Sequence, residues 1–204
     1  MGQTIVDLIR HGEPQGGSRY RGHRIDDPLS DKGWQQMWRA IGNMNPWQQI
    51  VSSPMLRCTE FAKQLAGKHN TPLHIEDNFK EVGFGSWEGL SREQVKQKDI
   101  AEYNNFYLDP VNNRPVGSEE LDTFIRRVTN AYSQVIKQFS NQHVLIVAHA
   151  GVIRAILAHV VQAPPQGIYN LKINNAGIAR IHINFVADKG SESSEIVFLN
   201  QSFH

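Results

Sequence analysis

Residues 5–13 read IVDLIRHGE, and this stretch decides the prediction of the fold. The run from Ile5 to Ile9, with two isoleucines and one valine, predicts a buried strand. Arg10, His11 and Gly12 follow it directly. A guanidinium and an imidazole are therefore expected at the C-terminal end of the first strand.

The rest of the chain alternates strand-like and helix-like segments. The longest helix is expected from Ser118 to about Phe139, where apolar residues recur every three or four positions. Further strands are expected at 49–52, 73–76, 144–148, 171–173, 178–185 and 196–199, and further helices at 30–42, 54–68, 151–161 and, after a capping box, from 91. This alternation predicts an α/β fold, a three-layer sandwich with a mostly parallel central sheet. Ligands of such sheets bind beyond the C-terminal strand ends.

The segment at 99–117 interrupts this pattern. It contains YNNFYLDPVNNRPVG, which is rich in Asn and Pro, and is expected to be an excursion over the surface. Together with the helix before it, at about 91–117, it could form a lid. We see no repeat and no linker long enough to separate domains, so residues 1–204 are expected to form a single domain.

Composition narrows the class of partner. Twenty-one Lys and Arg nearly balance 20 Asp and Glu, so no global field attracts nucleic acid or an anionic membrane. No stretch approaches the roughly 20 apolar residues that cross a bilayer. The N-terminus lacks the pattern of a signal peptide, and one cysteine cannot form an internal disulfide. A cytoplasmic protein is expected, with a small-molecule partner and with homodimerisation left open.

Four separate strand ends carry the residues that phosphoryl transfer to histidine requires. Besides Arg10 and His11, a second apolar strand ends on His149, Arg57 lies in the first turn of a helix after a strand, and Glu81 precedes a turn-rich stretch. Guanidinium groups bind phosphate oxygens, a neutral imidazole attacks in line, and a carboxylic acid protonates the departing oxygen.

These motifs in this order resemble the signature of the histidine phosphatase superfamily, the phosphoglycerate mutase-like enzymes. The matching segments are residues 8–13, 20–22, 27–30, 52–54 with Arg57, 81–89 and His149. The resemblance implies that His11 is the nucleophile, that Glu81 is the general acid and later the general base, and that Arg10, Arg57 and His149 bind phosphate. It also implies that Arg21, Gly22 and the Ala150 backbone lie near the substrate.

Two positions depart from that family. Many members carry Asn where Gly17 stands, so a pocket amide is missing or replaced here. Ala150 stands where Gly is usual after the second histidine, which matters little if only its backbone N–H is used.

The substrate is open at this level. Residues 20–23 with 27–30 are similar to bacterial α-ribazole-5′-phosphate phosphatases, which makes that ester of cobalamin biosynthesis the leading substrate. Broad-specificity sugar phosphatases and a fructose-2,6-bisphosphatase-like activity are the rivals. A mutase is disfavoured because the chain is short and shows no additional basic cluster after Glu88. A non-catalytic phosphate-binding module is disfavoured because it would need neither His11 nor Glu81.

Other tempting residues have simpler explanations. Cys58 lacks the arginine six positions on that cysteine phosphatases use, and is expected to be a packed helix residue. No HExxH pair or carboxylate cluster suggests a metal, so neither a metal nor another cofactor is expected. Arg126 and Arg127 are expected on a solvated helix face, and His23 close to the pocket loop.

Overall fold

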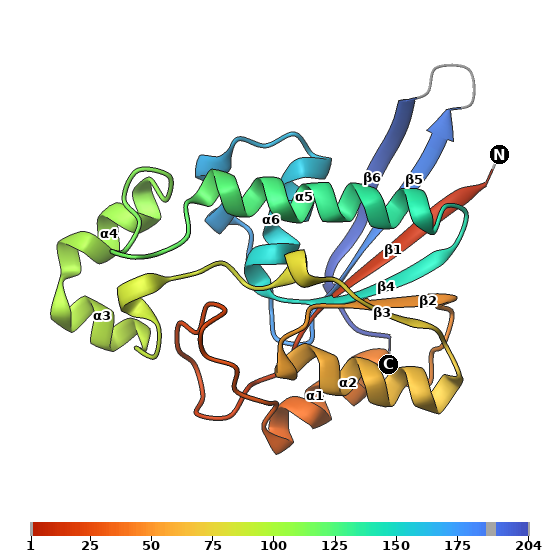
Figure 1. Cartoon of the computed structure of the whole chain (residues 1–204), viewed down its shortest axis with the longest axis horizontal. Coiled ribbons are helices and arrows are strands. Elements are labelled where there is room, and N and C mark those ends of the chain that lie inside the picture. The colour runs from red at the N-terminus through yellow and green to blue at the C-terminus, as the bar shows by residue number, and fades with distance from the viewer. Residues whose placement is uncertain (1, 187–190, 204) are drawn as a thin grey trace.

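The computed structural model describes residues 2–186 and 191–203. A six-stranded sheet runs through it in the order β3-β2-β4-β1-β5-β6 (Figure 1). The strands are β1 (Gln3–Arg10), β2 (Gln49–Ser52), β3 (Leu73–Ile75), β4 (His143–Ala148), β5 (Ile178–Val186) and β6 (Ser191–Gln201). The first four strands are parallel, while β5 and β6 form an antiparallel edge. The predicted α/β fold with a mostly parallel sheet is confirmed.

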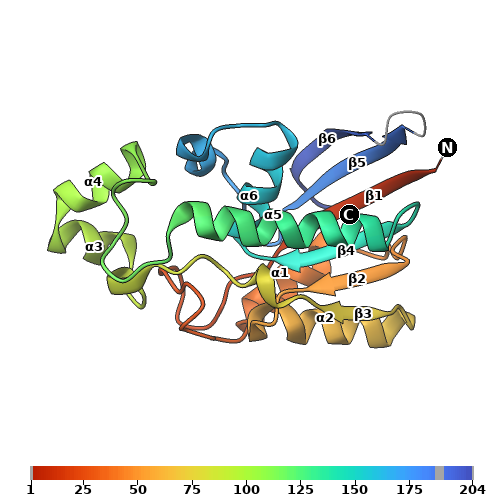
Figure 2. The ribbon, with the colours of Figure 1, turned by 45° about the horizontal axis from the view of Figure 1, so that its top comes forward.

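Helices cover both faces of this sheet, as Figure 2 shows. On one face lie α1 (Asp31–Ile41) and α2 (Leu56–His69), and on the other α5 (Leu121–Gln138) and α6 (Ala150–Val160). The central strands are buried on both sides. Leu8 and Ile146 belong to the core beneath α5 and α6, and Ile9 and Val147 to the core beneath α1 and α2, because successive strand residues point to opposite faces.

Local signals explain where several elements begin. Ser30 accepts a hydrogen bond from the Gly33 amide and caps α1, and Ser91 with Gln94 forms the expected capping box of α3 (Arg92–Lys98). The helices expected from 54 and 118 begin slightly later, at 56 and 121. Among the described residues, no helix is long and apolar enough to cross a membrane.

One strand prediction is wrong, and the predicted surface excursion at 99–117 contains a helix that the sequence analysis did not indicate. Residues 99–117 are not wholly irregular, since α4 (Ile100–Leu108) begins where the Asp99 carboxylate accepts the amides of Ala101 and Glu102. Residues 171–173 are not a strand. They follow a short 3₁₀ helix (Pro165–Asn170), and the carbonyl of Ile173 accepts a hydrogen bond from the side chain of Arg10 rather than from the backbone amide of a neighbouring strand.

The α3–α4 segment lies beyond the C-terminal ends of the parallel strands (Figure 1). An aromatic cluster joins it to the rest of the molecule. Phe106 of α4 packs against Trp87 and Tyr169, with ring centroids 4.9 and 5.0 Å apart, and Trp87 packs against Tyr20 at 5.1 Å. The segment is therefore built into the core close to the strand ends where a ligand is expected.

A buried carboxylate lies in the middle of β1. Asp7 has no exposed surface and accepts hydrogen bonds from the Trp47 indole, from Nε2 of His143 and from two nitrogens of Arg180, at 2.8 to 3.0 Å. The polar residue in the otherwise apolar IVDLI run is thus compensated by one cation, one imidazole and one neutral donor.

Candidate active site

Three neighbouring strands end at one edge of the sheet and bring the predicted residues together. Arg10 pairs with Ala148 across β1 and β4, and Ser52 pairs with Val147 across β2 and β4. His11 and Ser53 continue these ladders by donating their amides to the carbonyls of Ala148 and Val147. Because the strands are parallel, everything that follows them lies on the same side.

The His11 ring is held in a single tautomer. Its Nδ1 lies 2.7 Å from the carbonyl oxygen of Gly12, and a carbonyl can only accept, so Nδ1 carries the proton. Burial, together with the charges of Arg57 and Arg10, lowers the pKa of His11 well below its usual value. The ring is therefore neutral, and its Nε2 has a free lone pair.

His149 lies beside His11, with ring centroids 5.2 Å apart. It is fully buried. Its Nδ1 accepts from Nε of Arg57 at 3.3 Å, so Nε2 carries the proton and donates to Ser53 Oγ at 2.7 Å. Burial and the neighbouring Arg57 also lower the pKa of His149 well below its usual value. Its predicted contact with phosphate remains a prediction.

The two predicted phosphate-binding arginines are oriented by main-chain carbonyls. Arg57 is fully buried and donates to the carbonyls of Ile25 and Gly22, at 3.0 and 2.9 Å. Arg10 donates to the carbonyl of Ile173 at 2.7 Å, and its Nε is buried without a protein partner among the described residues. Among the described residues Arg10 forms no ion pair, and Arg57 only approaches the exposed Asp26, with Nη1 3.9 Å from Oδ1, so both guanidinium groups retain charge for an anion.

Glu81 reaches the same place from a loop, and amides hold its carboxylate. Oε1 accepts from the amide of Val82 at 2.9 Å and Oε2 from the amide of Gly151 at 3.2 Å. Gly151 lies in the first turn of α6, whose N-terminus favours a carboxylate. A Cβ at Gly151 would collide with this carboxylate, so the close approach requires glycine.

The backbone around Glu81 is fixed by a residue that the sequence did not single out. Arg127 was expected on a solvated face. It instead forms an ion pair with Glu119, 2.7 Å from Nε to Oε1, and donates to the carbonyls of Lys80 and Glu81. His23 also lies with its Nδ1 3.0 Å from the Glu81 carbonyl. The prediction for Arg127 was wrong because the helix face that carries it packs on the 78–81 loop.

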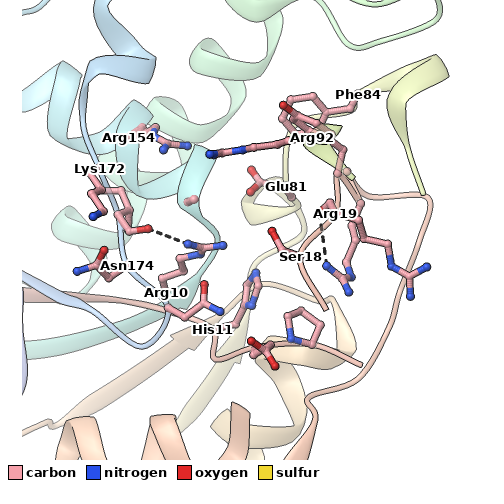
Figure 3. A pocket seen from close by; sticks show the side chains of 18 of the residues that line it. Arg10, His11, Ser18, Arg19, Glu81, Phe84, Arg92, Arg154, Lys172 and Asn174 are labelled. Carbon is pink, nitrogen blue, oxygen red and sulfur yellow. Dashed lines mark hydrogen bonds between the residues drawn. The ribbon is translucent and has the colours of Figure 1, made fainter. Parts of the chain in front are cut away.

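These residues surround a cavity of about 620 Å³, drawn in Figure 3. The predicted residues that line it are Arg10, His11, Arg21, Gly22, Arg57, Glu81 and Ala150. His149 lies behind His11 and is absent from the lining. No group of three or more His, Cys, Asp or Glu side chains within residues 2–186 and 191–203 could hold a metal ion.

Comparison with known proteins agrees with this geometry. Residues 6–188 match the model of the histidine phosphatase superfamily, branch 1. The chain belongs to that superfamily. The histidine phosphatase is 26% identical over 180 residues to the adenosylcobalamin/α-ribazole phosphatase of Salmonella typhimurium, covering 86% of this chain and 89% of the relative.

Two other relatives extend the comparison. The chain is 29% identical over 199 residues to a bifunctional protein of Mycobacterium tuberculosis, covering 95% of this chain but only 53% of the relative. The chain thus spans about half the length of the mycobacterial relatives that it matches. The structure of a mycobacterial glucosyl-3-phosphoglycerate phosphatase superposes with a TM-score of 0.85 at 22% identity, over 98% of this chain and all of the other, which shows a common fold.

Arg21 of this histidine phosphatase is held by the protein itself. Its Nη2 donates to the carbonyls of Gln15 and Gly17, at 2.6 and 2.7 Å, and its Nε pairs with Asp27 at 2.8 Å. It therefore shapes the loop that lines the cavity. Gly17 has φ +73°, and no heavy atom lies within 4 Å of where its Cβ would be, so no neighbouring group occupies the start of the missing side chain.

Cys58 lies 3.7 Å from Nε2 of His149 but is not suited to attack phosphorus. It is fully buried, and burial raises the pKa of its thiol to about 12. A thiol in this state is almost entirely protonated at neutral pH. The expectation that Cys58 is a packed helix residue is confirmed.

Sequence reasoning missed a group of basic residues. Arg19, Arg92, Arg154 and Lys172 all line the cavity, and the last three contradict the expectation of no additional basic cluster after Glu88. They come from a loop, from α3, from α6 and from the segment before β5. Only Arg154 carried a usable signal, because it lies one helical turn after the strand end at His149.

Proposed function

We propose that this histidine phosphatase hydrolyses small phosphomonoesters through a covalent phosphohistidine at His11. One observation carries the proposal. The bond from Nδ1 of His11 to the Gly12 carbonyl leaves Nε2 unprotonated, in a cavity that Arg10, Arg57 and Glu81 also line.

In the first step the lone pair of Nε2 attacks phosphorus, and the bond from phosphorus to the ester oxygen breaks. The guanidinium groups of Arg10 and Arg57 stabilise the charge on the non-bridging oxygens. The Glu81 carboxylic acid transfers its proton to the departing oxygen, which leaves as an alcohol.

In the second step the Glu81 carboxylate removes a proton from water. The water oxygen attacks the phosphorus, the bond from phosphorus to Nε2 breaks, and inorganic phosphate is released. The proton stays on Nδ1 throughout, hydrogen-bonded to the Gly12 carbonyl, so His11 returns as the same tautomer.

α-Ribazole-5′-phosphate is the substrate that the sequence favours, and the Salmonella relative supports it by its name. The mycobacterial structural relative acts, by its name, on a different ester. Sugar phosphates and a fructose 2,6-bisphosphate therefore belong in the same substrate panel. A mutase would return phosphate to an organic acceptor instead of water.

Trapping the intermediate tests the proposal. The enzyme is mixed with excess p-nitrophenyl phosphate, quenched in alkali, in which phosphohistidine persists, and digested for peptide mapping. We expect the phosphate on His11, and none on the same peptide of His11→Ala. A control variant, His74→Ala, changes an exposed histidine of β3 and should keep the label. Turnover without label, or label on another residue, would overturn the mechanism.

A further inference from the structure

The cavity contains more positive charge than one phosphate group needs. Seven cationic side chains line it, namely Arg10, Arg19, Arg21, Arg57, Arg92, Arg154 and Lys172. The carboxylates among the lining residues are Glu13 and Glu81, and Glu13 is paired with Lys32 at 2.9 Å. The lining therefore has a clear excess of positive charge.

Four of the seven cations have an evident task. Arg10 and Arg57 lie beside His11, where the phosphate that is removed would bind. Arg19 and Arg21 both pair with Asp27, at 3.2 and 2.8 Å. These two tie the 15–21 loop together and share the single negative charge of Asp27, so their charge is compensated in part.

Arg92, Arg154 and Lys172 remain. Within the described residues, none of the three forms an ion pair with a carboxylate. Nε of Arg154 donates to the Leu171 carbonyl at 2.7 Å, and its guanidinium lies over the ring of Tyr169, 5.4 Å from the centroid. The arginine is thus held in place while its terminal nitrogens stay available.

Figure 3 shows the guanidinium of Arg92 reaching toward Arg154, with Lys172 on the same side of the cavity as Arg154. The electrostatics of Arg10 agree with this arrangement. Burial lowers the pKa of Arg10 to about 10, Glu81 opposes this effect, and repulsion by Arg154 and Arg92 adds to it. Like charges gathered in this way repel one another, and a bound anion relieves the repulsion.

We propose that Arg92, Arg154 and Lys172 form a second anion site, which selects phosphomonoesters that carry another carboxylate or phosphate group. The inference rests on the proposed function, because it assigns the remote end of the same substrate. It disfavours α-ribazole-5′-phosphate, whose leaving group carries no second anion. Arginine binds either group through paired N–H donors, so the chemistry common to both is an anionic group with at least two oxygens.

Matched substrates test the proposal. 3-Phosphoglycerate and glycerol 3-phosphate differ only in a carboxylate against a hydroxymethyl group, and fructose 1,6-bisphosphate and fructose 6-phosphate differ in a second phosphate. We expect kcat/KM to favour the more anionic member of at least one pair by about tenfold or more, the effect of one charge-assisted hydrogen bond. The pair with the larger ratio identifies the anionic group.

Three variants assign the preference to residues. Arg92→Gln, Arg154→Gln and Lys172→Gln should each reduce that ratio by roughly fivefold or more, mainly through KM of the more anionic substrate. Arg126→Gln and Lys137→Gln remove the same charges from the exposed face of α5, and should leave the ratio unchanged. Added salt should reduce the preference of the wild type, in kcat/KM, for the more anionic substrate.

The outcomes separate the two proposals. The second anion site is overturned if the wild type favours the more anionic substrate of both pairs, in kcat/KM, by less than about twofold. It is also overturned if this preference is the same in the three variants and the two controls. If His11 is labelled in the trapping experiment, either result leaves the phosphatase proposal intact. If no phosphoenzyme forms, the proposed function fails whatever the ratios are.

Discussion

The amide of Gly151 lies 3.2 Å from Oε2 of Glu81, and the absence of a side chain at Gly151 is what permits this approach. One residue on α6 thereby sets the position of the predicted general acid, which belongs to a loop 70 residues earlier in the chain. The first prediction follows from this contact.

Gly151→Ala should displace the Glu81 carboxylate without unfolding the protein. Because a small misplacement of a catalytic group is costly, we expect kcat on glycerol 3-phosphate to fall by roughly tenfold to a hundredfold. Gly67→Ala is the matched control, since Gly67 lies in α2 with open space around it. It should retain activity and gain up to about 1 kcal/mol of stability. Equal kcat in the two variants would remove Gly151 from the mechanism.

The loss of kcat in Glu81→Gln should depend on how basic the leaving group is. Glutamine keeps the shape of the side chain but has no proton to transfer, and an alkoxide needs that proton more than p-nitrophenolate does. We expect a loss in kcat of about a hundredfold or more on glycerol 3-phosphate and a clearly smaller loss on p-nitrophenyl phosphate. Arg57→Ala should lower kcat on both substrates, because it weakens the stabilisation of charge in the transition state. If Glu81→Gln slows the pre-steady-state phosphorylation of His11 by the same factor with both substrates, the role of the carboxylate is structural.

The neutral state of His11 predicts the pH dependence of phosphorylation. Its pKa is lowered by burial and by Arg57 and Arg10, so Nε2 should stay unprotonated down to a pH below the usual value of about 6.5. The acidic limb of kcat/KM for p-nitrophenyl phosphate, set by His11, is therefore expected below that pH. His11→Ala should lose at least about a thousandfold in rate across the whole range. An acidic limb at or above pH 6.5 would contradict the assignment.

Activity should not depend on a divalent metal ion. Arg10 and Arg57 supply the charge that a metal would otherwise provide, so turnover of p-nitrophenyl phosphate should survive excess EDTA. Vanadate should inhibit as a mimic of the trigonal-bipyramidal transition state. Loss of turnover in EDTA that Mg²⁺ or Zn²⁺ restores would refute this expectation.

The buried carboxylate of Asp7 should make the free energy of unfolding depend on pH in the acidic range. Burial raises the pKa of Asp7, but hydrogen bonds from His143, Arg180 and Trp47 outweigh this effect and hold the pKa below its usual value. The stabilisation is therefore present above the unfolded-state pKa of about 3.9, and is lost as pH falls through the lower folded-state value. Asp7→Asn should lower the free energy of unfolding by about 3 kcal/mol or more at pH 7, because it leaves the Arg180 guanidinium without its buried carboxylate partner.

Urea unfolding at several pH values tests this prediction. The difference in free energy of unfolding between the wild type and Asp7→Asn should be constant from pH 7 to about pH 5 and shrink below about pH 4. Asp31→Asn, at an exposed position in the first turn of α1, should cost less than about 1 kcal/mol. A difference that grows on acidification would show that Asp7 is protonated in the folded protein.

The order of the main elements and the chemistry of the strand ends follow from local sequence patterns. Runs such as IVDLI predict strands because apolar residues there must be buried, and Ser30 and Ser91 predict helix starts because their side chains replace missing backbone bonds. Parallel strands share one C-terminal edge, so Arg10, His11 and His149 could be placed together without a structure. These signals are local, or follow from the topology alone.

Which side chains from other segments reach the cavity depends on tertiary packing. Arg92, Arg154 and Lys172 lie on three elements with no common motif, and Arg127 was assigned to solvent because helical periodicity cannot say what packs over a polar face. The α4 helix was missed because its Asn-rich composition outweighed the Asp99 cap, while burial of Phe106 stabilises it through residues far away in the chain. Such contacts depend on packing between distant segments, and no local pattern encodes that packing.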